Sequence, residues 1–223
     1  MKPIAIIHND YTSKFGIPRQ SGLVGEIVSK IVFEKEFRVP EALRGLEQFS
    51  HLWLLWEFSE AKREKWSPTV RPPRLGGNKR MGVFATRSPF RPNPIGLSAV
   101  KLEKIVEQKG EGLVLLVSGA DLLDGTPIYD IKPYIPLSDC IPDASEGYTE
   151  ETKLHSLKVE FPNELLDKIP NDKRTALIKI LEGDPRPSYI DDPERVFGVG
   201  FANVDVKFTV RDNVLTVVGV EKI

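Results

Sequence analysis

The chain has 223 residues, of which 40% are hydrophobic, so it is long and apolar enough to bury a full core. Its length favours one substantial domain together with a smaller one. The net charge of -1 predicts neither a nucleic-acid binder nor a membrane-surface protein, so any basic surface has to be local. The single Cys140 excludes an internal disulfide and a cysteine-based metal centre. No stretch approaches the length of a membrane span, and we expect a cytoplasmic protein.

Short β-type segments dominate the first two thirds of the chain, with glycine and proline between them in place of long amphipathic helices. The segments are 4–8, 25–33, 52–58, 81–85, 98–106, 113–118 and 128–134. Because strands that do not alternate with helices form antiparallel sheets, we expect a mainly β domain over residues 1–137, built as an antiparallel sheet or barrel. Only Pro40–Gln48 is predicted to be helical here, with Leu43 and Leu46 facing a core.

The last third of the chain follows a different pattern. Residues 138–153 are acidic and rich in turn formers, which predicts a linker or a long loop. Residues 154–223 are expected to form a small α+β domain with helices over 162–169 and 171–182, the second with Asn171 as its N-cap and Gly183 just past its end. The alternating runs 204–210 and 214–220 flank Asp212 and Asn213, a pattern typical of a hairpin.

The segment from Lys65 to Lys101 holds eight basic residues and no acidic one, in a chain of otherwise balanced charge. Proline fixes φ and glycine allows close backbone approach, so the loops at 71–77 and 85–91 can hold arginines in fixed directions. Composition alone favours a solvated basic loop. The lack of carboxylates within the same segment shifts the interpretation toward a phosphate-binding surface.

Several motifs carry a resemblance to a known family. They are MGVFATRSPFRPNPIG at 81–96, RPPRLGG at 71–77, DGTP at 124–127 and DIKPY at 130–134, with PRQ at 18–20, LEQFSHLW at 46–53 and DPRP at 184–187. In these motifs, which span nearly the whole chain, the sequence resembles the TrmO (YaeB/TsaA) family of tRNA methyltransferases. Ordered motifs of this length are far more specific than a lone GxGxxG.

The resemblance implies a single-sheet β-barrel that binds S-adenosylmethionine and forms a homodimer. It further implies methylation of the exocyclic nitrogen (N6) of threonylcarbamoyladenosine beside the anticodon, with the anticodon stem-loop of tRNA as the partner. No glycine-rich dinucleotide fingerprint follows a predicted strand, so the cofactor site has to be built from loops of the barrel. By resemblance, the cofactor contacts are Pro18, Arg19, Gln20, Ser59, Glu60, Arg87, Leu97, Asp121, Leu122, Leu123 and Asp124.

Other roles remain open for some of these residues. Ser59 and Glu60 stand where the family has a His-Gln-like pair, so we expect a backbone contact there. An ordinary turn is the alternative for the 18–20 segment. For Asp121 and Asp124 the alternative is turn capping ahead of a glycine.

The proposed reaction makes two further demands on the sequence. The tRNA phosphates need cations, and the candidates are Arg71, Arg74, Lys79, Arg80, Arg91 and Arg186. Methyl transfer to nitrogen needs in-line positioning and a path for the departing proton, and the candidate bases, which the sequence does not rank, are Asp130, Tyr134, Asp184 and Tyr189. Packing is the alternative role for both tyrosines. The three histidines share no metal-ligand spacing, so no metal site is expected.

Two other classes of function compete with the methyltransferase. A non-catalytic tRNA-binding module that senses S-adenosylmethionine would use the same barrel, and it would differ in leaving the RNA unmethylated. A phosphoester hydrolase is disfavoured because the sequence shows no cluster of carboxylates and histidines for catalytic metal ions.

Overall fold

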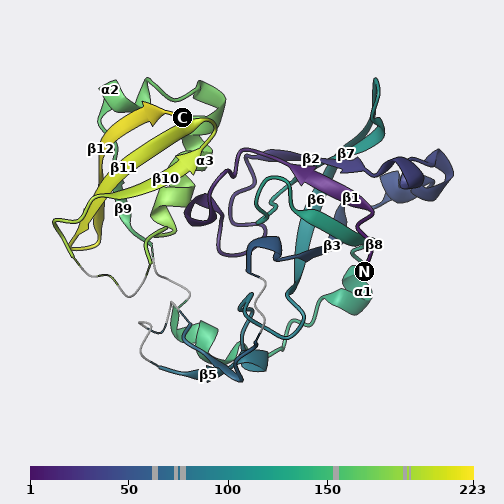
Figure 1. The fold of residues 1–223 in the computed structure, drawn as a ribbon, viewed down its shortest axis with the longest axis horizontal. Coiled ribbons are helices and arrows are strands. Elements are labelled where there is room, and N and C mark those ends of the chain that lie inside the picture. The colour runs from purple at the N-terminus through teal and green to yellow at the C-terminus, as the bar shows by residue number, and fades with distance from the viewer. Residues whose placement is uncertain (62–64, 73–74, 76–78, 153–155, 188–189, 191) are drawn as a thin grey trace.

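A computed structural model describes residues 1–61, 65–72, 75, 79–152, 156–187, 190 and 192–223 of the chain. The chain is mainly β, as predicted, with one sheet in its N-terminal part and another in its C-terminal part (Figure 1). Within the described residues, no helix combines the length and apolar character that crossing a membrane requires.

The N-terminal sheet closes on itself. In the described part of the chain it forms a closed barrel of antiparallel strands in the order β1-β2-β7-β6-β3-β8, and β8 completes it by pairing with both β3 and β1. These strands are β1 (Ala5–His8), β2 (Val28–Phe33), β3 (His51–Glu57), β6 (Ile95–Gln108), β7 (Gly112–Ser118) and β8 (Pro127–Pro133). Along β3, Leu54 and Trp56 are buried while Trp53 is half-buried on the other face. The two tryptophans therefore face opposite sides, because residues three apart in a strand lie on opposite faces.

Short 3-10 helices, labelled η, connect the early strands. They include η1 (Lys14–Gly16), η2 (Lys35–Phe37), η3 (Pro40–Leu43) and η4 (Leu46–Gln48). The one helix predicted over residues 40–48 is thus two 3-10 turns, because Gly45 between them has a φ of 89° and interrupts any helix. Leu43 and Leu46 pack against the barrel core, as predicted.

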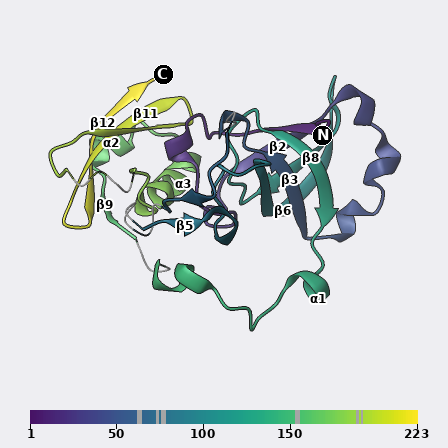
Figure 2. The same cartoon turned by 60° about the horizontal axis from the view of Figure 1, so that its bottom comes forward.

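A long excursion between β3 and β6 carries the basic segment. It contains η5 (Ser59–Ala61), a ladder of β4 (Thr69–Val70) and β5 (Met81–Gly82), and η7 (Val83–Ala85). The strand predicted over 81–85 ends at Gly82, because the Thr86 N–H donates to the Val83 carbonyl and closes a 3-10 turn. Both views place this excursion near η8 (Gly147–Thr152) of the predicted linker, whereas α1 (Pro136–Asp139), where the same stretch begins, lies farther from it (Figures 1 and 2).

The C-terminal part is a four-stranded sheet with helices. The strand order is β10-β11-β12-β9, and the elements are β9 (Lys158–Glu160), α2 (Asn163–Leu166), α3 (Asn171–Glu182), β10 (Phe197–Phe201), β11 (Val204–Arg211) and β12 (Val214–Lys222). The predicted hairpin is present, with Asp212 and Asn213 at positive φ. The predicted N-cap is one residue off, because Pro170 is extended and its carbonyl accepts the first helical bond from Lys173. Gly183 ends the helix, as predicted.

Some residues of the N-terminal part are buried in the apolar core of the C-terminal part, which is separate from the barrel core. Tyr11, Val24 and Ile27 of the N-terminal part are buried in the same cluster as the apolar faces of α3 and the C-terminal sheet. Polar bonds cross the same junction: the Ala202 N–H donates to the Asp10 carbonyl at 3.2 Å, and Lys173 pairs with the Asp10 carboxylate. The C-terminal part therefore packs against the N-terminal part and is not connected to it by the linker alone.

The packing of Trp56 against β6 generates a stability prediction. Gly96 lies directly opposite Trp56, and a Cβ at this position would lie 2.2 Å from the Trp56 Cε2 atom. Gly96→Ala should therefore lower the free energy of unfolding by about 1–3 kcal/mol, as overpacking does. Urea unfolding would measure it, with Gly25→Ala as the control because no atom lies within 4 Å of that Cβ. Equal stability of the two variants would contradict this packing.

Candidate functional site

A chain of hydrogen bonds runs from the barrel core to the partly buried carboxylate of Asp121. The Trp56 Nε1–H donates to the Ser98 Oγ at 2.9 Å, and the Ser98 hydroxyl donates to the Asp121 Oδ1. Ser98 lies on the inward face of β6, where its neighbours Gly96 and Val100 are also buried. A core tryptophan thus fixes the serine hydroxyl that orients the carboxylate.

The surroundings of Asp121 make its charged form costly. Burial raises the pKa of the Asp121 carboxyl above its ordinary value of 3.8, and this effect outweighs the lowering by the Ser98 hydrogen bond, by the Arg87 charge and by a backbone hydrogen bond from Ser21. A desolvated carboxylate of this kind is stabilised by a cation or a hydrogen-bond donor placed against it. The site is therefore suited to a ligand that brings one.

Arg87 joins Asp121 to the loop that contains Gln20. The Arg87 Nη1 donates to the Gln20 Oε1 at 2.8 Å, and the positive charge of Arg87 acts on the Asp121 carboxylate. Three predicted cofactor residues that lie far apart in the sequence are thus brought together. The resulting cluster of Gln20, Arg87 and Asp121 is called the rim cluster below.

Arg91 holds the loop that presents Arg87. Its Nη1 donates to the carbonyl oxygens of Thr86 at 2.9 Å and Ser88 at 3.3 Å, and the Ser88 N–H donates to the Thr86 hydroxyl. These bonds close the loop on itself. The contacts give Arg91 an anchoring role beside its predicted role in binding RNA.

The C-terminal part reaches the same region through the DPRP motif at 184–187. Arg19 donates to the Asp184 carbonyl oxygen. The Asp184 carboxylate binds Arg186 in a bidentate pair, with 2.8 Å from Nε to Oδ1 and 3.0 Å from Nη2 to Oδ2. The PRQ motif, in which Pro18 is half-buried, therefore lies between the rim cluster and the C-terminal part.

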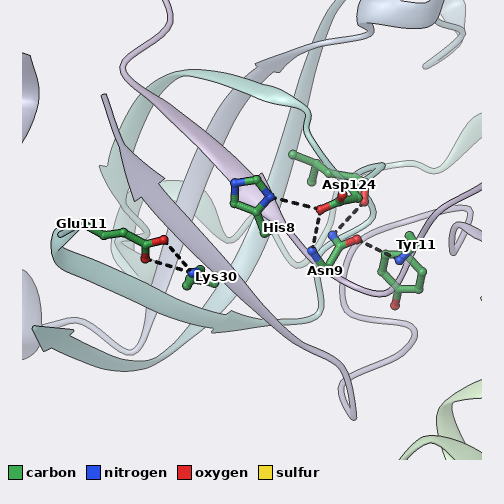
Figure 3. Close-up of polar contacts among 7 residues, drawn as sticks. His8, Asn9, Tyr11, Lys30, Glu111 and Asp124 are labelled. Carbon is green, nitrogen blue, oxygen red and sulfur yellow. Dashed lines mark hydrogen bonds and ion pairs between the residues drawn. The ribbon is translucent and has the colours of Figure 1, made fainter. Parts of the chain in front are cut away.

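Asp124 belongs to a separate turn network (Figure 3). Its Oδ1 accepts from the Asn9 N–H at 3.0 Å and lies 3.4 Å from the His8 Nδ1, while the Asn9 side chain donates to the Leu122 carbonyl at 3.0 Å. Leu122 itself is buried in the barrel core, and Leu123 is half-buried. These contacts match the turn-capping alternative for Asp124, whereas Asp121 lies in the rim cluster.

The other predicted cofactor residues make contacts of their own. Ser59 and Glu60 are exposed in η5, where the Glu60 carboxylate lies 3.5 Å from the Lys14 Nζ. Leu97 is exposed on β6 and, as the neighbour of the inward Ser98, points to the outer face of the barrel.

The candidate bases lie in two places. On the outer face of β3 and β8, Asp130 pairs with Lys132 at 2.9 Å and the Tyr134 ring packs against Trp53 at 5.4 Å between centroids. Among the candidates in the described part of the chain, Asp184 contacts the PRQ loop through its backbone carbonyl oxygen. Tyr189 lies outside the described residues.

The predicted RNA contacts gather on the excursion that holds β4 and β5. Arg71, Lys79 and Arg80 are exposed there, and Arg80 also donates to the Thr69 hydroxyl at 3.3 Å. Arg74 lies outside the described residues, and Arg186 has its carboxylate partner in Asp184. In the described residues no group of three or more His, Cys, Asp or Glu side chains lies close enough to hold a metal ion.

Comparison with known proteins identifies the family. Residues 6–140 match the tRNA-methyltransferase O N-terminal domain, and residues 155–223 match the TrmO C-terminal domain. The chain belongs to the tRNA-methyltransferase O family.

Two bacterial relatives match over most of their length. The chain is 42% identical over 217 residues to an Escherichia coli (strain K12) protein named tRNA (adenine(37)-N6)-methyltransferase, covering 94% of this chain and 92% of the relative. It is 40% identical over 214 residues to the putative S-adenosylmethionine-dependent methyltransferase RcsF of Pseudomonas aeruginosa, covering 92% and 90%. The crystal structure of TrmO from P. aeruginosa resembles it with a TM-score of 0.78 at 35% identity, covering 99% and 95%.

Ser98 and the Ser21 backbone, which support the rim cluster of this TrmO family member, were not identified from the sequence. One signal for Ser98 is available, since it is a polar residue at an inward position of an alternating apolar strand. Buried polar groups at such positions need partners, and here the partners are Trp56 and Asp121. The Ser21 contact leaves no signal, because it is made by the backbone.

The raised pKa of Asp121 predicts a pH-dependent stability. The native state binds this proton more tightly than the unfolded chain, so stability falls as pH rises from 3.8 through the raised pKa of Asp121. Asp121→Asn removes the titration and keeps an oxygen for Ser98. Urea unfolding over a pH series should therefore show the wild type losing stability relative to the variant across this window. If the difference in unfolding free energy between the two proteins stays constant or grows in favour of the wild type, burial does not raise the pKa of Asp121.

Proposed function

We propose that the chain is an S-adenosylmethionine-dependent tRNA methyltransferase that methylates N6 of threonylcarbamoyladenosine beside the anticodon. The observation that carries this proposal is the rim cluster, in which Gln20, Arg87 and Asp121 meet on a barrel whose sequence matches the TrmO N-terminal domain. The name of the E. coli relative places its own methylation on N6 of adenine 37 of tRNA.

The side chains of the rim cluster fit the cofactor chemically. S-adenosylmethionine carries an ammonium and a sulfonium cation, a carboxylate, ribose hydroxyls and an adenine. Asp121 offers a carboxylate to a cation or a hydroxyl, Arg87 offers a guanidinium to the carboxylate, and the Gln20 amide both donates and accepts. When bound, the cofactor supplies an electrophilic methyl group on sulfur.

The residues of the chain itself position the two reactants and provide a path for the departing proton. Holding two reactants in line is worth about 7–11 kcal/mol of the barrier. The anchored loop around Arg87 and the core-supported Asp121 provide such rigidity on the cofactor side. The nitrogen that gains the methyl loses a proton to one of the candidate bases. Among these, Asp184 contacts the PRQ loop through its backbone carbonyl oxygen, while its carboxylate is engaged by Arg186.

The exposed cations on the β4–β5 excursion are proposed to bind the anticodon stem-loop. Arg71, Lys79 and Arg80 supply positive charge in a segment without acidic residues, and phosphate contacts position an RNA without reading its sequence. Arg186 at the junction is proposed to add a contact from the C-terminal part.

We also propose that the chain acts as a homodimer in the cytoplasm, where its tRNA substrate is found. Leu137 is 96% exposed, and Ile135 and Ile141 beside it are also exposed, next to the outward-facing Trp53 that bonds Asp139. A second copy of the chain would cover this apolar stretch through a two-fold contact.

A methyl-transfer assay tests the proposed function. The purified chain with bulk tRNA and methyl-labelled cofactor should place label in tRNA, and nucleoside mass spectrometry should find it on threonylcarbamoyladenosine. Arg87→Ala should lower kcat/KM about 10- to 150-fold, since hydrogen bonds to charged groups are worth about 1.5–3 kcal/mol. Lys158→Ala on β9 serves as the control. Cofactor and tRNA binding without methyl transfer would favour the sensing module instead.

A further inference from the structure

Two large aromatic rings are stacked on the surface of the basic excursion. Trp66 and Phe84 lie 6.2 Å apart between ring centroids with 29° between their planes, and they are 52% and 73% exposed. Single exposed aromatic side chains are common, but two exposed rings stacked on each other are a surface feature that needs an explanation.

Backbone hydrogen bonds hold the segment that follows Trp66 against the segment that precedes Phe84. The β4–β5 ladder pairs Thr69 with Gly82, and just beyond it the Val83 N–H donates to the Pro68 carbonyl at 2.9 Å. Val83 is buried, so the next side chain, Phe84, is turned outward beside Trp66. The closeness of the two rings thus follows from the pairing of these two backbone segments.

The charge around the pair restricts what can cover it. Lys65 precedes Trp66, and Arg71, Lys79 and Arg80 are exposed on the same excursion. Among the described residues none of these four cations forms an ion pair. A second copy of the chain would bring like charges together across a two-fold axis, which is unfavourable. The partner that matches this surface is an anion with flat apolar faces, such as unpaired nucleic acid.

The pair also lies close to the rim cluster along the chain. Phe84 and Arg87 are three residues apart, a separation of at most about 11 Å for an extended chain. The Thr86 and Ser88 bonds to Arg91 keep this short segment in one conformation. A base stacked on the rings would therefore be a close neighbour of the base at the proposed methyl-transfer site.

We propose that Trp66 and Phe84 form a stacking platform for an unpaired anticodon-loop base next to the target adenosine. This inference rests on the proposed function for the identity of the RNA. Stacking on aromatic side chains tolerates any base because every base has a π face. The platform would thus hold the loop in place while phosphate contacts set its position.

Binding of an anticodon stem-loop RNA by the full chain tests the platform. Trp66→Ala and Phe84→Ala should each weaken binding about 5- to 150-fold, while Trp66→Phe keeps most of the affinity. The same stem-loop with abasic nucleotides flanking the target adenosine should bind the wild type equally weakly, and the alanine variants should lose nothing further on it. Phe49→Ala, an exposed aromatic on the barrel, is the matched control.

Tryptophan fluorescence gives a second readout that does not need methyl transfer. Trp56 is buried and Trp53 is bonded to Asp139, so quenching by the stem-loop should come from Trp66 and disappear in Trp66→Phe. Three outcomes would each overturn the platform. The alanine variants could lose the same affinity for intact and abasic RNA, they could lose no affinity for RNA at all, or they could change the oligomeric state of the chain and leave its RNA affinity unchanged. Base-dependent binding without methylation would support the platform and count against the proposed enzyme.

Discussion

The hydrogen bond from Trp56 to Ser98 is the interaction on which the candidate site depends. The indole ring of Trp56 is packed in the core, and its N–H orients the Ser98 hydroxyl. That hydroxyl in turn orients Asp121. The bond requires Trp56 to lie where Gly96 has no side chain, so one glycine in β6 makes room for the whole arrangement. The Ser98 hydrogen bond and the Arg87 charge offset part of the desolvation cost of this carboxylate, and a ligand that brings a further charge or donor offsets more of it.

The C-terminal part extends this rigidity to the other side of the site. Because Tyr11, Val24 and Ile27 are buried in its core, the PRQ loop at 18–20 lies between two packed elements. Arg19 then links that loop to Asp184, whose carboxylate is occupied by Arg186. The site is thus built from loops, but each loop is attached to a core or closed by its own hydrogen bonds, which is what precise positioning of two substrates requires.

Much of the fold follows from local pattern. The strands of the barrel are marked by β-branched runs between glycines and prolines, and the terminal hairpin by Asp212 and Asn213 at its turn. The helix predicted over 40–48 was wrong because the positive φ of Gly45 divides it into two turns. The N-cap predicted at Asn171 was wrong because Pro170 takes the capping position. The burial of N-terminal residues in the C-terminal core depends on contacts between distant segments, which periodicity does not reveal.

The site was predictable in part. Gln20 and Arg87 lie in the family motifs and Asp121 was expected from the resemblance to the family, and the structure brings the three together. The motifs do not separate Asp121 from Asp124, because both are aspartates near a turn and only their partners differ: Ser98 and Arg87 for one, Asn9 and His8 for the other. Ser98 and Ser21 lie outside the motifs, and only Ser98, as a polar residue at an inward strand position, leaves a signal in the sequence.

A crystal structure of the chain with bound S-adenosylhomocysteine, the demethylated cofactor, tests the central claim most directly. The account predicts that the ligand lies against Gln20, Arg87 and Asp121, with the Trp56–Ser98 bond intact. A ligand bound elsewhere, for example in the hollow lined by Pro40, Leu43 and Leu113, with the rim cluster unchanged, would contradict it.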